Sequence, residues 1–122
     1  DIEVRAVKVN ALLQELTSGK ANGTGTVSGR IPLVIDDEGT PIIRNANLTS
    51  DKNGRIHIAE DAIPDSNEQM GVLKGVLSNF HYNVLSITLG TDENRKLFAR
   101  LRVEGRNPTM YNGKPVKLNV QL

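Results

Sequence analysis

The side chains best suited to acid–base or metal chemistry in this chain are its two histidines, His57 and His81. Each lies in a strand-like pattern, and neither has a second His, Asp or Glu at the i and i+4 spacing that places two metal ligands on one helix face. His57 lies between two isoleucines of a short alternating run, so a solvated strand position is expected for it. His81 lies between two aromatic residues, where a partly buried, hydrogen-bonded imidazole is expected. The sequence therefore predicts no metal site.

Two acidic clusters, at 36–38 and 92–93, stand beside turn glycines. Asp side chains in turns accept hydrogen bonds from nearby backbone N–H groups, so turn chemistry is favoured over a calcium site or a glycosidase carboxylate pair. The glycine-rich segment 23–29 lacks the Lys and the helix of a phosphate-binding loop, and it is predicted to be a strand bent by glycine. Ser28 and Ser86 have no nucleophile-elbow context. The chain is therefore expected not to be an enzyme, with no catalytic residue and no cofactor.

Composition is consistent with one domain that spans residues 1–122 and has an aliphatic core, since 38% of the residues are apolar and only 3% are aromatic. The 15 basic and 14 acidic residues nearly cancel, which gives no electrostatic reason to propose nucleic acid as a ligand. Without Cys there is no disulfide and no thiolate metal site. The chain begins at Asp1 and has no apolar run of about 20 residues that could cross a bilayer, so it is interpreted as the C-terminal fragment of a longer protein.

The elements that carry these residues are mainly strands, with two helices. The first helix follows a strand at 2–9, with Asn10 as its predicted N-cap and Gly19 at its end. The second is predicted over 67–79 after a capping box at 66–69, and its apolar residues form one stripe. That stripe is expected to cover a sheet face rather than to bind a cofactor.

The longest strand is predicted over 21–36, at an edge or a bulge because Pro32 has no N–H to donate. A turn leads into a strand over 40–48. The Asn-Gly pair within 51–54 then predicts a hairpin into a short strand over 55–59. The whole stretch is therefore predicted to form a meander.

Three more strands are predicted over 80–89, 96–103 and 116–122. In the first of them apolar residues occupy both faces, so this strand is expected to be covered on both sides. The predicted fold class is mainly β (α+β): a curved antiparallel sheet or β-groove of about six to seven strands, with one or two short helices covering a face.

The closing segment alternates strictly between apolar and polar residues and predicts a half-buried strand. Nothing in the sequence blunts its edge if it lies at the rim of a sheet, so it is expected to pair with a partner strand or with a copy of itself. The apolar residues that would set the register of such a pairing are Val116, Leu118, Val120 and Leu122.

Three segments together resemble the C-terminal region of YdbH-type proteins, members of the AsmA-like group of Gram-negative envelope proteins. They are Gly25-Thr26-Val27-Ser28-Gly29-Arg30-Ile31-Pro32, Val103-Glu104-Gly105-Arg106-Asn107-Pro108 and Pro115-Val116-Lys117-Leu118-Asn119-Val120. The Asn53-Gly54-Arg55-Ile56 segment and a helix that runs into a strand over 73–82 agree with the same pattern. The likeness covers most of the chain, from about Gly23 to the end.

The resemblance implies an inner-membrane-anchored protein with a long periplasmic β-groove that carries phospholipid toward the outer membrane. It also implies a small outer-membrane lipoprotein that docks at the C-terminal end by strand addition. The same family region has carried the label "dicarboxylate transport", but the sequence has no visible dicarboxylate site.

A conduit for acyl chains needs an apolar trough rather than a reactive group. The candidate lining residues are Val27, Ile31, Leu33, Leu97 and Leu101, joined by Leu118 and Val120 of the closing strand. An ordinary core position is favoured for each of them over a groove position, because alternation does not distinguish a groove from a packed interior. The helix predicted over 67–79 leaves a second alternative, in which the domain caps the groove and lipid passes only upstream.

Two other function classes remain open from the sequence. A structural or adhesive β-domain, such as a carbohydrate-binding module of a secreted protein, is the main alternative. Sugar binding commonly uses exposed aromatic rings, and the chain has no Trp and only four other aromatic residues, Phe80, Tyr82, Phe98 and Tyr111. A hydrolase is the least favoured class, because only the two histidines could serve it.

Overall fold

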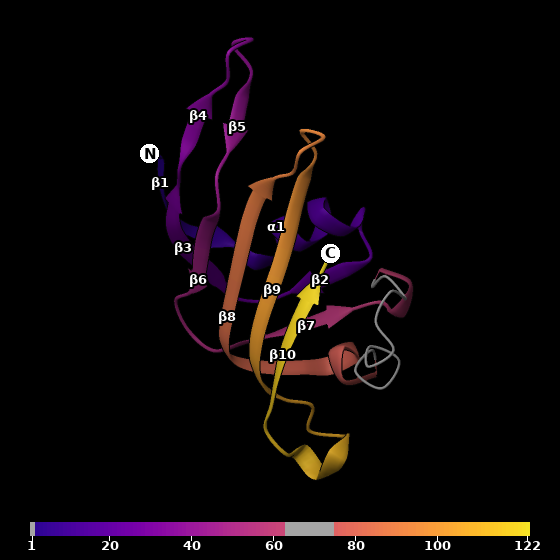
Figure 1. Cartoon of the computed structure of the whole chain (residues 1–122). Coiled ribbons are helices and arrows are strands. Elements are labelled where there is room, and N and C mark those ends of the chain that lie inside the picture. The colour runs from indigo at the N-terminus through magenta and orange to yellow at the C-terminus, as the bar shows by residue number, and fades with distance from the viewer. Residues whose placement is uncertain (1, 63–74) are drawn as a thin grey trace.

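The computed structural model describes residues 2–62 and 75–122. Most of its strands form one antiparallel sheet of eight strands that is not closed into a barrel, which confirms the predicted fold class (Figure 1). These strands are β1 (Ile2–Lys8), β2 (Ala21–Gly23), β3 (Thr26–Ile31), β6 (Ala46–Ser50), β7 (Gly54–Ile58), β8 (Phe80–Thr91), β9 (Leu97–Arg106) and β10 (Val116–Gln121).

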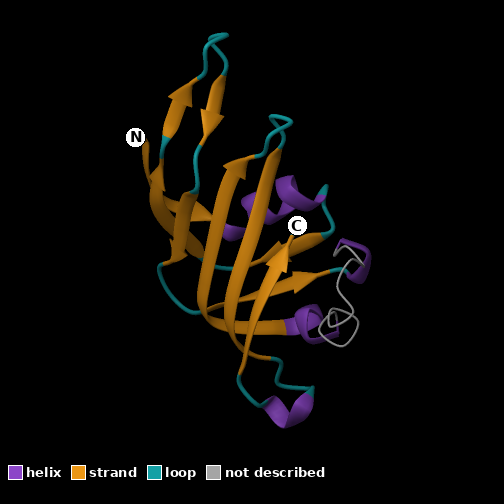
Figure 2. Ribbon diagram, in the orientation of Figure 1, coloured by secondary structure: helices purple, strands orange, loops and turns teal. Residues whose placement is uncertain are grey.

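A second sheet has two strands, β4 (Leu33–Ile35) and β5 (Pro41–Ile43), which project from the main sheet as a finger (Figure 2). The helical elements within the described residues are α1 (Val9–Thr17), a helical piece at 75–76 and three short 3-10 turns, η1 (Glu60–Ala62), η2 (Leu77–Asn79) and η3 (Tyr111–Gly113). The strand number exceeds the expected six or seven because the predicted strands over 21–36 and 40–48 both break into shorter pieces.

Strand β8 is the centre of the main sheet. One of its edges pairs with β9, and its other edge pairs with β6 over one half and with β7 over the other. Ala46 lies opposite Leu89, and further along the same edge Gly54 lies opposite Tyr82. Because β6 and β7 are both antiparallel to β8, they run in the same direction, and the hairpin predicted at 51–54 is wrong. The chain continues past the Asn-Gly pair instead of reversing.

The next pair of strands outward from β8 is divided at the same point along the sheet. Strand β2 pairs with β7, and β3 pairs with β6. Gly25, with φ of +92°, separates β2 from β3. The predicted meander over 21–59 is therefore wrong as well. This stretch is one long, bent hairpin with the β4–β5 finger at its tip.

The sheet bends where β8 carries a bulge between Tyr82 and Val84. Figure 2 shows β8 changing direction along its length. Before the bulge Phe80 and Tyr82 are buried, and after it Leu85, Ile87 and Leu89 are buried. A bulge inserts one extra residue and so exchanges the two faces of a strand. The apolar residues on the two predicted faces of this strand therefore lie largely on one side of the sheet. The expectation that the strand is covered on both sides is wrong.

Tyr82 fills the inside of the bend. Its hydroxyl donates a hydrogen bond to the carbonyl oxygen of Thr24, at 2.8 Å, across the break between β2 and β3. A Cβ atom on Gly54 would lie only 2.5 Å from that hydroxyl oxygen. Glycine is required at this position because the aromatic ring occupies the space that a side chain would need.

Helix α1 packs its apolar stripe, which includes the fully buried Val9 and Leu13, against the inside of the sheet. Asn10 lies within the helix, so the predicted N-cap is wrong. Lys8 holds the cap position without a side-chain bond, and the Asn10 amide oxygen accepts instead from the N–H of Gly23. At the other end Ser18 adopts the left-handed conformation, and Gly19 donates its N–H to the Gln14 carbonyl.

One apolar core lies between the inside of the sheet and the helical elements. The predicted second helix falls largely on 63–74, outside the described residues, and only its last residues, including the buried Val76 and Leu77, are described. The buried apolar residues are Val9, Leu13, Ala21, Val27, Ala46, Leu48, Ile56, Ile58, Val76, Leu77, Phe80, Tyr82, Leu85, Ile87, Leu89, Ala99, Leu101, Val103, Leu118 and Val120.

Candidate functional site

The predicted lining residues separate into two groups. Val27 and Leu101 are 0% and 1% exposed and belong to the packed core. Ile31 is half-buried against that core, whereas Leu33 and Leu97 are 42% and 55% exposed. The apolar inner face of the sheet is therefore covered over one part of its length and open to solvent over another.

The open part extends from the core onto the finger. Leu33 lies opposite Ile43, and Ile43 packs against the core cluster, so this pair continues the inner face of the main sheet. Ile35 has the same face as Leu33 and is 59% exposed. On β9, Leu97 has the same face as the buried Ala99 and Leu101. We call these residues the apolar rim: Ile31, Leu33, Ile35, Ile43 and Leu97.

Ile43 is a member of the rim that the alternation in the sequence does not identify. A single strand over 40–48 would place Ile42 on the inner face together with Ala46 and Leu48. Asn45 has a φ of +43° in the break between β5 and β6, and this left-handed residue shifts the alternation. Asn tolerates the left-handed conformation better than most residues. An Asn just before a buried strand is therefore the one indication in the sequence that the alternation shifts here.

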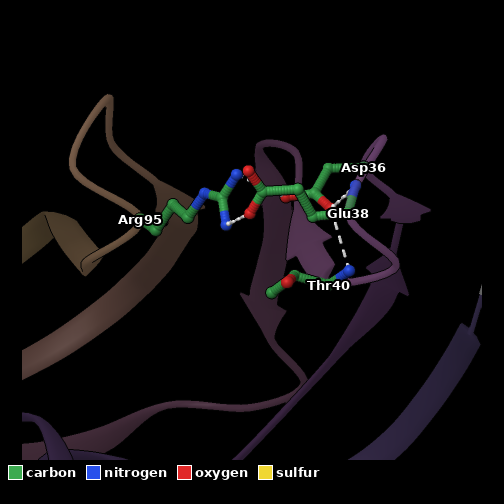
Figure 3. A network of polar contacts seen from close by, with 4 residues as sticks. All are labelled: Asp36, Glu38, Thr40 and Arg95. Carbon is green, nitrogen blue, oxygen red and sulfur yellow. Dashed lines mark hydrogen bonds and ion pairs between the residues drawn. The ribbon is translucent and has the colours of Figure 1, made fainter.

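Polar contacts hold the finger beside the turn that joins β8 to β9. The N–H of Ile43 donates to the hydroxyl of Thr91 at 3.1 Å. The Arg95 guanidinium reaches across to Asp36 and Glu38 in the finger turn, at 3.0 Å and 2.9 Å (Figure 3). The two turns that border the rim are thereby linked through one side chain.

Asp36 organises the finger turn, as predicted for the acidic clusters. Its Oδ1 accepts hydrogen bonds from the N–H groups of Thr40 at 2.8 Å and Glu38 at 2.9 Å (Figure 3). The bond from Thr40 does most to hold the pKa of Asp36 below its ordinary value; the bond from Glu38 and the charge of Arg95 add to it, and partial desolvation opposes it. Asp92 accepts from two N–H groups of its own turn in the same way.

Strand β10 lies at the edge of the sheet, since β9 is the only strand it pairs with among the described residues. Leu118 and Val120 are buried, and Val116 and Leu122 are half-buried, so all four predicted partner-strand side chains face the core side. The N–H of Leu122 donates to Ala99 of β9. Backbone groups of successive strand residues point to opposite edges, so those of Lys117, Asn119 and Gln121 point away from β9.

The two histidines lie apart from the rim and from β10. His57 is exposed, and its Nδ1 lies 2.6 Å from the carbonyl oxygen of Ser78, while His81 is half-buried in β8. Within 2–62 and 75–122 there is no group of three or more His, Asp or Glu residues that could hold a metal ion. No helix in the same ranges is both long enough and apolar enough to cross a membrane.

Comparison with known proteins gives one match. The model of the YdbH-like family, described as intermembrane phospholipid transport protein YdbH, matches residues 2–122. No curated protein and no solved structure matches the chain.

Proposed function

This chain belongs to the YdbH-like family, a family of intermembrane phospholipid transport, and from that premise we propose that it forms the end of a phospholipid conduit. In this proposal the chain is a non-enzymatic domain in the periplasm, part of a longer inner-membrane-anchored protein. It offers apolar contact to lipid at one end and an open strand edge to a lipoprotein at its C-terminus. The two contacts use different parts of the fold.

The observation that carries the lipid part of the proposal is the apolar rim. Monomeric proteins bury most of their large aliphatic side chains, and a contiguous exposed group of them is typical of a binding surface. The rim is continuous with the core through Ile43, so acyl chains that enter along it would meet an unbroken apolar face. Each methylene taken out of water there contributes about 0.8 kcal/mol.

The covered part of the inner face supports a capping role. Val27 and Leu101 are buried in the core, and no acyl chain fits among side chains packed at core density. The proposed conduit therefore ends inside this domain: lipid contacts the rim, and the core closes the groove. Of the five predicted lining residues, Ile31, Leu33 and Leu97 are assigned to lipid, and Val27 and Leu101 to the cap.

Native mass spectrometry of the purified chain for bound phospholipid tests this assignment. Leu33 and Leu97 are exposed, so the double substitution L33D/L97D leaves the core intact and places two charges on the rim. The matched control is Y111D, because Tyr111 is also exposed, at 49%, and η3 lies at the far end of the sheet from the finger (Figure 1). We expect phospholipid adducts on the wild type and on Y111D and none on L33D/L97D. Equal adducts on all three proteins contradict the proposal.

The second part of the proposal is strand addition at β10 by a small outer-membrane lipoprotein. The support is the open edge, where the backbone groups of Lys117, Asn119 and Gln121 point away from β9. An added strand takes its affinity from main-chain hydrogen bonds and its register from alternate side chains. A copy of the same chain is the competing occupant of this edge.

Asn119→Pro tests this interface with little disturbance of the sheet. Proline removes an N–H that points to the open edge, so pairing with β9 keeps its bonds, and edge strands tolerate proline. Asn119→Thr keeps the N–H and serves as the matched control. Amide hydrogen exchange of β10 is measured with each of a panel of purified, delipidated outer-membrane lipoproteins. We expect one of them to slow exchange in the wild type and in Asn119→Thr but not in Asn119→Pro, and protection that survives the proline rejects the interface. Sedimentation of the chain without any lipoprotein measures whether it forms a dimer, and so distinguishes self-pairing from binding of a lipoprotein.

A further inference from the structure

Three basic side chains form a row across the outer face of the sheet, opposite the core. Arg55 of β7 lies directly opposite His81 of β8, and His81 lies directly opposite Arg106 of β9. Directly paired residues of an antiparallel sheet project from the same face. The neighbours of this row along the strands, Ile56 and Phe80, are buried on the other face, so the row points outward. This arrangement is invisible in the sequence because the three residues are far apart in it.

The row lies in a surface hollow at the bend. Gly54, Tyr82 and Gly105 form the next row of paired residues, and Tyr82 turns inward to fill the bend. A Cβ on Gly54 would point to the same inner side as the tyrosine ring, so on the outer face this row offers only backbone beside the basic row. The residues that line the hollow are Asn53, Gly54, Arg55, His81, Tyr82, Asn83, Gly105, Arg106 and Pro115.

The two arginines of this row have no ion-pair partner in the part of the chain that the structure describes. Neither Arg55 nor Arg106 makes an ion pair there, and the nearest carboxylate on the same face of β9, Glu104, lies 3.3 Å from Lys117. Like charges gathered on one face of neighbouring strands destabilise a sheet. The two arginine-bearing strands are about 10 Å apart, one on each side of β8, so both guanidinium groups can reach an anion held above His81.

We propose that this hollow binds a phosphate group. The geometry points to an oxyanion, because guanidinium groups present paired N–H donors that match the oxygen atoms of phosphate and carboxylate. The choice of phosphate rests on the proposed function, since a transported phospholipid carries a phosphodiester in its headgroup. A phosphate monoester or inorganic phosphate has the same recognition chemistry. The hollow is distinct from the apolar rim: it lies at the bend and on the outer face.

Titration followed by NMR of the backbone amides tests the site with two soluble probes, inorganic phosphate and glycerophosphoglycerol, a phosphodiester without acyl chains. The variants are R55Q and R106Q, which keep a polar side chain and remove one charge each. R102Q is the matched control, because Arg102 is an exposed arginine on the same face of β9 outside the hollow. We expect saturable shifts at 81–83 and 105–106, with affinity reduced about tenfold in R55Q and R106Q and unchanged in R102Q, since a hydrogen bond to a charged group is worth on the order of that factor.

Each outcome decides the proposal. Binding of the phosphodiester with these variant effects supports a headgroup site, and binding of inorganic phosphate alone supports a site for free phosphate. Equal weakening in all three variants shows general charge attraction and overturns the site, as does the lack of any saturable shift. Neither probe has an acyl chain, so this titration tests the hollow separately from the rim. A failed titration does not count against lipid binding at the rim, and missing phospholipid adducts do not count against the phosphate site.

Discussion

The covered and the open ends of one apolar sheet face differ only in what lies over them. Leu101 and Leu97 are four residues apart on the same face of β9, yet Leu101 is 1% exposed and Leu97 is 55% exposed. Val27 and Leu33 show the same contrast along the other side of the sheet. Alternation places all four on the inner face, and the covering elements alone separate a core residue from a rim residue.

The longest helix among the described residues is short. Helix α1 has only nine residues, about 14 Å of length at 1.5 Å per residue. The inner face over β8, β9 and the finger is longer than this helix (Figure 1). Among the residues that the structure describes, this helix packs mainly against β2 and β1 and leaves the rim uncovered.

The largest predicted effect sharpens the contrast between the two ends. Leu101→Ala is expected to lower the free energy of unfolding by about 3 kcal/mol, because it removes buried methyl groups and leaves a cavity in the core. Leu97→Ala removes the same atoms from an exposed position and is expected to change stability by less than about 1 kcal/mol. Urea denaturation of both variants measures the difference. Similar losses for the two substitutions would mean that the rim is packed like the core.

The bend joins the two ends, and Gly54→Ala tests how tightly it is built. The added methyl group would overlap the Tyr82 ring. The Cβ at position 54 would lie 2.7 Å from the Cζ of Tyr82 and 2.9 Å from the carbonyl oxygen of Thr24. Overpacking of this kind is expected to lower the free energy of unfolding by about 2 kcal/mol. Urea denaturation measures it, with Asn53→Ala, an exposed neighbour, as the control. If Gly54→Ala is as stable as the control, the ring does not fill the bend as described.

A smaller effect is expected from Tyr82→Phe, which keeps the ring and removes its bond to Thr24. We expect a loss of about 1 kcal/mol at neutral pH. Burial, with a further effect from the charge of Asp51, raises the pKa of Tyr82 above its ordinary value of 10.0. The pKa of Tyr82 is higher in the folded than in the unfolded protein. The phenol therefore contributes fully to the free energy of unfolding below pH 10.0, and this contribution is lost as the pH rises through the folded pKa.

Denaturation of the wild type and Tyr82→Phe over an alkaline pH series checks this prediction. The difference in stability between the two proteins is expected to shrink as the pH rises above 10.0, because Phe does not titrate. Tyr111→Phe, at an exposed tyrosine, is the control and is expected to show no such dependence. A constant difference across the series would contradict the buried position of the phenol.

The smallest effect is expected from Arg95→Gln at the open end. The Arg95 pairs lie at the surface, and exposed ion pairs contribute little to global stability. Amide hydrogen exchange in the finger, 33–43, is expected to become a few-fold faster while exchange in the core of β8 stays unchanged. The pKa of Asp36 is lower in the folded than in the unfolded protein. The ionised carboxylate therefore stabilises the finger above its ordinary pKa of 3.8, and this stabilisation is lost as the pH falls through the folded pKa.

An acid titration of the Asp36 carboxyl by NMR completes this test. Removal of the Arg95 charge is expected to move the pKa of Asp36 upward, toward the ordinary value, so that the finger loosens at a higher pH than in the wild type. The bonds from Thr40 and Glu38 remain, and only part of the lowering is therefore lost. Finger exchange that does not respond to the substitution would show that the two turns are held together without Arg95.

The fold class and most strand positions could be predicted because alternation is a local property of the chain. Residues 99–103 alternate between apolar residues and arginine, and every second residue from Ala99 to Val103 is buried as expected. Prediction failed at the bend. There the Asn53-Gly54 pair fits a hairpin turn, whereas its glycine makes room for the Tyr82 ring, a residue distant in sequence.

The candidate sites were predicted to different degrees for the same reason. Strand β10 itself follows from its own alternation, whereas its place at the edge of the sheet comes from its pairing with β9 alone among the described residues. Of the rim, Ile31, Leu33 and Leu97 were predicted as part of a longer set of lining residues, and Ile43 was missed because Asn45 shifts the alternation. The basic row of Arg55, His81 and Arg106 was missed, because strand pairing brings together three residues that no local pattern connects.

The sequence by itself determined which face of each strand is apolar, where the acidic turns lie and to which family the chain is similar, because these depend on residue type and spacing along the chain. Tertiary structure alone decided which apolar residues are covered, where the sheet bends and which side chains meet across strands. Those properties depend on where the covering segments pack on the sheet and on the register of β8 with its neighbours. Both are set by packing between distant segments, and no single segment contains them.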